Sequence, residues 1–85
     1  MNKNVIIYTS SLCGFCYSAK SLLKRKGIPY KEIDIDLNYE KRIEMIKKSN
    51  GQTSVPQIFF KNRHVGGCDD LFKLENENDL EFLKN

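Results

Sequence analysis

The chain has 85 residues and a mass of 9.9 kDa, which is enough for a single domain, residues 1–85. Apolar residues make up 40% and charged residues 29%, which excludes a disordered or low-complexity chain. The net charge of +3 is too small to indicate nucleic-acid binding, and no apolar run approaches the roughly 18 residues of a membrane span. The start of the chain lacks the features of a signal peptide, so we expect a soluble, cytoplasmic protein with no membrane partner.

The first half of the chain is predicted to form a strand, a helix and a second strand. Residues 5–8 are a continuous apolar run, typical of a buried strand. Gly27 suits the left-handed position that ends a helix, and residues 31–36 alternate like a strand with one solvated face. The helix between them has apolar side chains at helical spacing: Cys16, Ala19, Leu22 and Leu23. The right-handed crossover of such a unit predicts parallel strands.

A second helix is predicted to extend to about Ser49, where Asn50 and Gly51 end it. Its first residue can be capped by Asp36 or Asn38. Its inner stripe is predicted to consist of Tyr39, Ile43 and Ile46.

A hairpin and a third helix are predicted to complete the chain. Residues 57–60 and 63–65 form strands on either side of a turn at residues 61–62. The helix starts near Asp69 with Leu71, Phe72 and Leu74 inward, and Asp79 can cap a last turn that carries Leu80 and Leu83. The order βαβαββα predicts an α/β domain with a four-stranded mixed sheet flanked by helices.

Cys13 and Cys16 form a C-x-x-C pair between the first strand and the first helix. In a reducing compartment such a pair is catalytic or metal-binding rather than structural. Cys13 is expected at the helix N-cap, where the N–H groups of residues 14–16 and the helix dipole favour its thiolate. Cys16 lies one turn inside, so we predict that Cys13 is the nucleophile and Cys16 the resolving cysteine. Gly14 lets the backbone open toward a substrate, and Phe15 offers an apolar surface beside the sulfur.

Zinc binding is the alternative use of these cysteines. A Cys₃His set can be written from Cys13, Cys16, His64 and Cys68. The spacing of its second pair is irregular, and its first pair lies at a helix start rather than in a zinc knuckle. The prediction is therefore no metal site, with His64 an exposed hairpin residue.

Two later segments could form a ligand groove. Val55 offers an unpaired backbone edge, which a cis Pro56 would expose for pairing with a short peptide. The free N–H groups at residues 66–70 would bind a carboxylate, and an Asp side chain there could hold an amine. Taken alone, this second segment is more simply a turn with Asp69 as a helix cap.

Together these pieces resemble the glutaredoxins, in particular the small bacterial glutaredoxin-3 type. The resemblance rests on three motifs in order: Cys-Gly-Phe-Cys at residues 13–16, Ser-Val-Pro-Gln-Ile-Phe at residues 54–59 and Gly-Gly-Cys-Asp-Asp-Leu at residues 66–71. It implies a thioredoxin fold, a cis Pro56 and glutathione as co-substrate. The implied activity is thiol–disulfide exchange, with protein disulfides and glutathionylated proteins as substrates.

The resemblance also implies which residues bind glutathione: Phe15, Arg42, Ser54, Val55, Pro56, Cys68 and Asp69. Val55 would pair its backbone with the cysteinyl part, while Cys68 and Asp69 would take the γ-glutamyl end. Arg42 is the best match for the residue that takes the glycine carboxylate, and Lys41 is the alternative.

The sequence departs from the family pattern in two ways, at Ser10 and at the Gly14-Phe15 pair. Ser10 stands where many members carry Lys, which removes one cation from the surroundings of the thiolate. Gly14 and Phe15 stand where many members have Pro-Tyr, and they resemble the monothiol relatives that hold a [2Fe–2S] cluster between two subunits. The alternative to a monomeric oxidoreductase is therefore a cluster-loaded dimer with Cys13 and glutathione as ligands.

Overall fold

The computed structural model describes residues 4–84, in which one four-stranded mixed sheet is flanked by helices. The elements in chain order are β1 (Val5–Thr9), α1 (Gly14–Arg25), β2 (Tyr30–Asp34), α2 (Tyr39–Lys48), β3 (Gln57–Phe60), β4 (Arg63–Gly66), α3 (Cys68–Asn76) and a 3₁₀ helix, η1 (Leu80–Lys84). The strand order is β2-β1-β3-β4. The β1–β2 pair is parallel and the β3–β4 hairpin is antiparallel, as the sequence predicted, and β1 and β3 also pair antiparallel.

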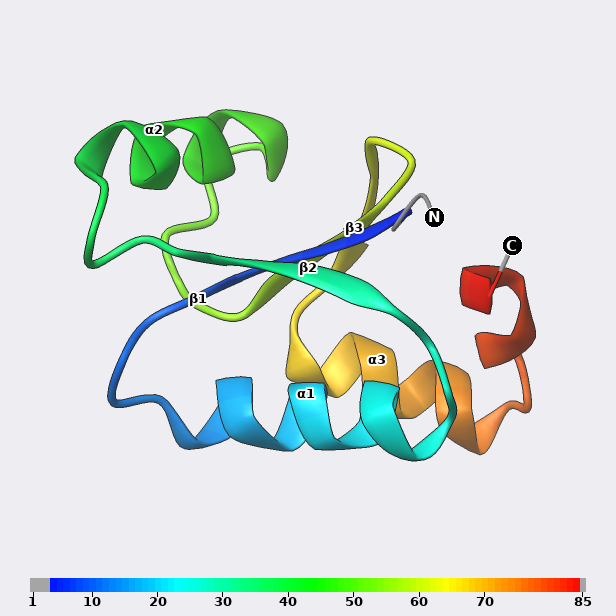
Figure 1. Ribbon diagram of the computed structural model, residues 1–85. Coiled ribbons are helices and arrows are strands. Elements are labelled where there is room, and N and C mark those ends of the chain that lie inside the picture. Colours follow the sequence, from blue (N-terminus) through cyan, green and yellow to red (C-terminus); the bar gives the residue numbers. More distant parts are fainter. Residues whose placement is uncertain (1–3, 85) are drawn as a thin grey trace.

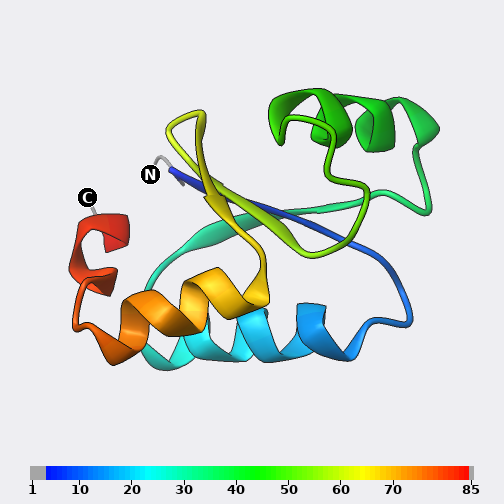
Figure 2. The ribbon, with the colours of Figure 1, turned by 180° about the vertical axis from the view of Figure 1, so that it is seen from behind.

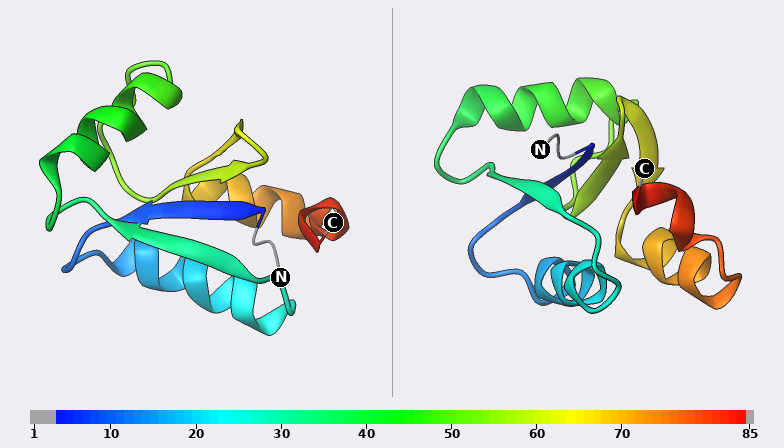
Figure 3. Two further views of the ribbon diagram at one scale, coloured as in Figure 1. Left: turned by 45° about the horizontal axis from the view of Figure 1, so that its top comes forward. Right: turned by 45° about the vertical axis from the view of Figure 1, so that its right-hand side comes forward.

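Helices α1 and α3 cover one face of the sheet, and α2 covers the other (Figures 1 and 2). The turned views in Figure 3 show the same layering. Successive side chains of a strand point to opposite faces, so Val5 and Ile7 pack in the cluster with α1 and α3 while Tyr8 packs beneath α2. None of the helices described between residues 4 and 84 is long and apolar enough to cross a membrane.

The boundaries of α1 follow from its end residues. Cys13 is the N-cap in extended conformation, and Lys24 and Arg25 in the last turn complement the negative end of the helix dipole. Gly27 has a φ of +70°, and the next N–H, that of Ile28, donates to the carbonyl of Leu23 over 2.9 Å. The predicted left-handed end of this helix is confirmed.

Strand β2 ends two residues earlier than predicted. The Asp34 carboxylate accepts a hydrogen bond from the Asp36 N–H at 2.8 Å, which turns the chain out of the sheet. Asp36 is not the helix cap either, because Asn38 takes that position and accepts from the N–H groups of Glu40 and Lys41.

The predicted inner stripe of α2 is wrong at two of its three positions. Tyr39 is 73% exposed and Ile43 is 42% exposed. Met45 and Ser49 are buried instead, and Lys41, Arg42, Glu44 and Ile46 are half-buried. Most of these residues are polar, and the Ser49 hydroxyl is satisfied by donating to the Met45 carbonyl over 2.7 Å. Hydropathy alone therefore pointed to the wrong face.

The β3–β4 hairpin turns at Lys61 and Asn62, whose φ values of 48° and 69° fit a tight primed turn. An irregularity in the ladder lies between Ile58 and Phe59, and it places Phe59 opposite His64. Beyond the hairpin, α3 starts one residue earlier than predicted, with Gly67 rather than Asp69 as its N-cap.

Candidate active site

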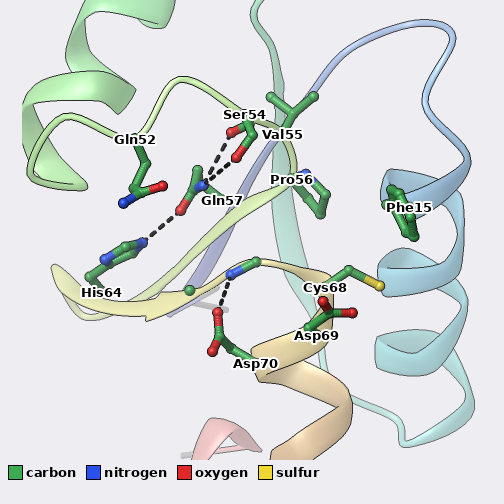
Figure 4. A pocket seen from close by; sticks show the side chains of 12 residues that line it. Phe15, Gln52, Ser54, Val55, Pro56, Gln57, His64, Cys68, Asp69 and Asp70 are labelled. Carbon is green, nitrogen blue, oxygen red and sulfur yellow. Dashed lines mark hydrogen bonds between the residues drawn. The ribbon is translucent and has the colours of Figure 1, made fainter.

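A groove of about 440 Å³ lies between the first turn of α1, the loop before β3 and the junction of β4 and α3 (Figure 4). The carboxyl ends of strands in α/β sheets are the usual place for such sites. Six of the seven residues predicted to bind glutathione line it: Phe15, Ser54, Val55, Pro56, Cys68 and Asp69. Segments far apart in the sequence therefore meet at one groove.

Cys13 lies beside this groove as the N-cap of α1. Its Sγ accepts a hydrogen bond from the Cys16 N–H at 3.1 Å and lies 3.8 Å from the carbonyl oxygen of Val55, to which the thiol can donate. The sequence predicted donors from residues 14 to 16, and among the described residues only the Cys16 amide donates to this sulfur. Cys13 is half-buried, so its sulfur remains accessible to a substrate.

Cys16 is the shielded member of the pair. It is 2% exposed, and its thiol is free. Burial raises the pKa of the Cys16 thiol to about 12, and its contact with Cys13 adds to the increase. The Ser10 N–H and the charge of Lys20 only partly offset this. Reduced Cys16 is therefore a neutral thiol at physiological pH.

Cys68 is a third free cysteine on the groove wall. It is half-buried, and its sulfur points toward α1 (Figure 4). Burial, followed by the charges of Asp69 and Cys13, raises the pKa of this thiol. Cys68 therefore contributes a neutral, weakly polar surface to the groove.

The loop before β3 carries the cis peptide bond that the sequence resemblance implied, between Val55 and Pro56. The Gln57 side-chain amide donates to the Ser54 carbonyl at 3.1 Å, with the Ser54 hydroxyl at 3.4 Å. Gln57 also hydrogen-bonds His64, with 2.6 Å between Oε1 and Nε2. Side chains of β3 and β4 thus hold the backbone of this loop.

The β4–α3 junction has no room for a side chain at Gly66. Gly66 has a φ of +125°, and a Cβ there would lie 2.2 Å from Asp70 Oδ2. That carboxylate caps α3 by accepting from the Gly67 N–H at 2.9 Å. A Cβ on Gly67 would be 3.3 Å from the carbonyl oxygen of Pro56, so the two walls of the groove approach closely here.

Arg42 and Lys41, the candidates for the glycine carboxylate, lie on α2 and do not line the groove. Lys41 Nζ forms an ion pair with Glu44 Oε1 at 3.2 Å. The Arg42 guanidinium has no partner among the described residues. Arg42 is therefore the cation of the two that remains available.

No three His, Cys, Asp or Glu side chains gather in a metal-binding cluster within residues 4–84. The Cys₃His set that the sequence allowed is not assembled. His64 shares the groove wall with Cys68, but its ring stacks on Phe59 with centroids 4.9 Å apart and its Nε2 is hydrogen-bonded to Gln57.

Sequence reasoning missed Gln52, Gln57 and His64 as groove residues. Gln57 lies inside the Ser-Val-Pro-Gln-Ile-Phe motif, which was the available signal, but only the hairpin register shows that His64 reaches it. Gln52 has no such signal in the sequence.

Similar proteins identify the family. The glutaredoxin family model matches residues 5–65. Glutaredoxin 3 of Escherichia coli K12 is 51% identical over 80 residues, which cover 94% of this chain and 95% of that protein. The solution structure of a glutaredoxin from Brucella melitensis is 49% identical with a TM-score of 0.81, and covers 94% of this chain and 86% of its own.

A more distant structure is the holo form of glutaredoxin C1 from Populus tremula x tremuloides. It is 26% identical with a TM-score of 0.84, covering 95% of this chain and 82% of its own. The predicted thioredoxin fold and the resemblance to the glutaredoxin-3 type are confirmed. With its C-x-x-C pair at a helix start, this chain belongs to the glutaredoxins, a family of thiol oxidoreductases.

Proposed function

We propose that the protein is a glutathione-dependent thiol–disulfide oxidoreductase of the cytoplasm. The observation that carries the proposal is the position of Cys13 Sγ. This sulfur accepts a hydrogen bond from the Cys16 N–H at 3.1 Å and lies 3.8 Å from the backbone carbonyl oxygen of Val55. A sulfur in this place faces the groove edge on which the cysteinyl part of glutathione would pair. The neutral wall at Cys68 and the carboxylate of Asp69 are suited to the γ-glutamyl end, whose amine is positive.

In the monothiol route, the Cys13 thiolate attacks the glutathione sulfur of a mixed disulfide. The bond between Cys13 and glutathione forms while the bond to the client sulfur breaks, and the client leaves as a thiolate. A second glutathione thiolate then attacks the bound glutathione sulfur. Oxidised glutathione forms, and Cys13 leaves as a thiolate again.

In the dithiol route, the Cys13 thiolate attacks one sulfur of a protein disulfide and forms a mixed disulfide with the client. The client S–S bond breaks, and the other client sulfur leaves as a thiolate. Cys16 must then lose its proton and attack Cys13 Sγ, which closes the Cys13–Cys16 disulfide and expels the client thiolate. Because burial raises the pKa of the Cys16 thiol, its deprotonation is expected to make the dithiol route slower than the monothiol route at neutral pH.

Glutathione-dependent reduction of a small mixed disulfide tests the proposal. Cys13→Ser is expected to abolish turnover, whereas Cys16→Ser should keep much of it because the monothiol route needs only Cys13. Both variants are compared with wild type for reduction of a protein disulfide, which should require both cysteines. Turnover that survives the loss of Cys13 would show that the assigned roles are wrong.

A second candidate is a [2Fe–2S] cluster held between two copies of the chain. Two observations favour it: the Gly14-Phe15 pair, and the similarity to the glutaredoxin C1 structure, which is a holo form. The residues fit a shared cluster, since Cys13 is accessible and Cys16, at 2% exposed, is not. Each copy would supply one thiolate, with two glutathione thiolates completing the set.

When bound, such a cluster would serve for iron–sulfur transfer or sensing. Anaerobic reconstitution with iron, sulfide and glutathione tests this candidate, with absorbance and molecular mass as readouts. A coloured dimer that Cys13→Ser cannot form is expected if the candidate is correct. A colourless monomer eliminates it.

A further inference from the structure

We infer that Gln57 and His64 are positioning residues that orient the backbone edge of the groove on which glutathione pairs. The inference rests on the proposed function and adds two residues to it. The three side chains of Ser54, Gln57 and His64 form one chain of hydrogen bonds along the groove wall (Figure 4).

The direction of each hydrogen bond in this chain is determined by its partners. The Gln57 Nε2 group donates to the Ser54 carbonyl, so its Oε1 is left to accept. His64 must therefore donate from Nε2, at 2.6 Å, which fixes its tautomer. Gln57 is only 4% exposed, so both of its polar atoms are used by protein groups rather than by water.

The Gln57 bond fixes the plane of the Ser54–Val55 peptide. That peptide is trans, so its carbonyl and its N–H point in opposite directions. Holding the Ser54 oxygen toward Gln57 therefore holds the Val55 N–H away from Gln57. Within residues 4–84 this N–H donates to no protein acceptor, and it remains available for a ligand.

His64 holds Gln57 in turn. Its ring stacks on Phe59 with 27° between the planes, and Phe59 is 1% exposed, so the ring rests on a fixed core residue. A relay of contacts therefore connects the core residue Phe59 to the Ser54–Val55 peptide through His64 and Gln57. Its effect is on glutathione binding, and it makes no contact with the Cys13 sulfur.

Steady-state kinetics with glutathione test the inference, after wild type has been shown to turn over with glutathione. Gln57→Leu should raise the KM for glutathione about three- to tenfold, the effect of one lost hydrogen bond, with kcat within about twofold. His64→Phe keeps the stack on Phe59 and should raise the KM about twofold. Arg63→Ala, next to His64 on β4 and exposed, is the control and should keep the wild-type KM.

The alkylation rate of Cys13 and the double variant separate this role from a general structural one. Alkylation should change less than about twofold in Gln57→Leu, because the relay does not touch the sulfur. The double variant Gln57→Leu/His64→Phe should have the KM of Gln57→Leu alone, because His64 acts through Gln57.

An unchanged KM in Gln57→Leu, or multiplying effects in the double variant, overturns the inference. His64→Phe changes an exposed side chain and keeps the test available if Gln57→Leu does not fold. Absence of glutathione turnover in wild type would instead refute the proposed function.

Discussion

The N–H of Cys16 donates to Cys13 Sγ over 3.1 Å, so the backbone of one active-site cysteine stabilises the sulfur of the other. The two thiols are nevertheless unequal. Cys13 is accessible beside the groove, whereas Cys16 is 2% exposed and its pKa is raised to about 12, chiefly by burial. One turn of helix thus separates an accessible thiol from a protected one.

This asymmetry predicts selective alkylation. At about pH 8 an uncharged reagent such as iodoacetamide should modify Cys13 at least about tenfold faster than Cys16, because a buried thiol with a pKa of about 12 is almost fully protonated. Peptide mapping by mass spectrometry after short exposure measures both rates. Denatured protein is the control, since unfolding should make the rates similar. Equal labelling in the folded protein would contradict the assigned roles.

Elements whose signals are local could be predicted from the sequence. The apolar run of β1 and the glycine that ends α1 depend on neighbouring residues, and both agree with the structure. The inward face of α2 was predicted wrongly because it includes the polar residues Arg42 and Ser49. The buried Ser49 hydroxyl donates to the Met45 carbonyl, and the half-buried Arg42 keeps its charge near solvent. No hydropathy pattern carries that information.

The site divides in the same way. The Cys-Gly-Phe-Cys and Ser-Val-Pro segments are contiguous motifs, so it could be predicted that they meet: Ser54, Val55 and Pro56 line the groove, and Cys13 lies beside it. The contact between Gln57 and His64 could not, because it depends on the irregular register of the hairpin between Ile58 and Phe59. Contacts between strands require the pairing itself to be known.

The hydrogen bond between Tyr8 of β1 and Glu44 of α2 predicts that the stability of the fold decreases in acid. The Glu44 carboxylate accepts a hydrogen bond from the Tyr8 hydroxyl, and this bond is the main reason that the pKa of Glu44 lies below its ordinary value. The hydrogen bond from Lys41 and its positive charge lower the pKa further. A carboxylate with a lowered folded pKa contributes stability above its unfolded pKa and loses it as the pH falls through the folded value. Glu44→Gln should therefore reduce the free energy of unfolding at about pH 7 and flatten its decline toward about pH 3.

Urea unfolding at several pH values measures this effect. Tyr8→Phe should remove most of the same pH dependence and lower the free energy of unfolding by about 1.5–3 kcal/mol at neutral pH, the value of one hydrogen bond to a charged group. Glu77→Gln is the matched control, because Glu77 is exposed and has no ion pair within the described residues. An acid slope in Glu44→Gln as steep as that of wild type would rule out this account.

The β4–α3 junction predicts a strict requirement for glycine at residue 66. Gly66→Ala places a Cβ 2.2 Å from Asp70 Oδ2 at a φ of +125°, so the cap of α3 must move. We expect a loss of about 1–3 kcal/mol in the free energy of unfolding and a higher KM for glutathione. Gly14→Ala is the control for stability, since its Cβ meets nothing within 4 Å. Similar stability of the two variants would show that the junction tolerates a side chain.

Arg42 remains the predicted partner of the glycine carboxylate, although it lies on α2 outside the groove wall. Its guanidinium is free within the described residues, whereas Lys41 is paired with Glu44. A solvent-accessible ionic contact contributes about 0.2–1 kcal/mol, so Arg42→Ala should raise the KM for glutathione by up to about fivefold. The increase should shrink as salt is added, because screening weakens the contact in wild type. Lys41→Ala is the matched variant, and a larger KM increase in it than in Arg42→Ala would transfer the role to Lys41.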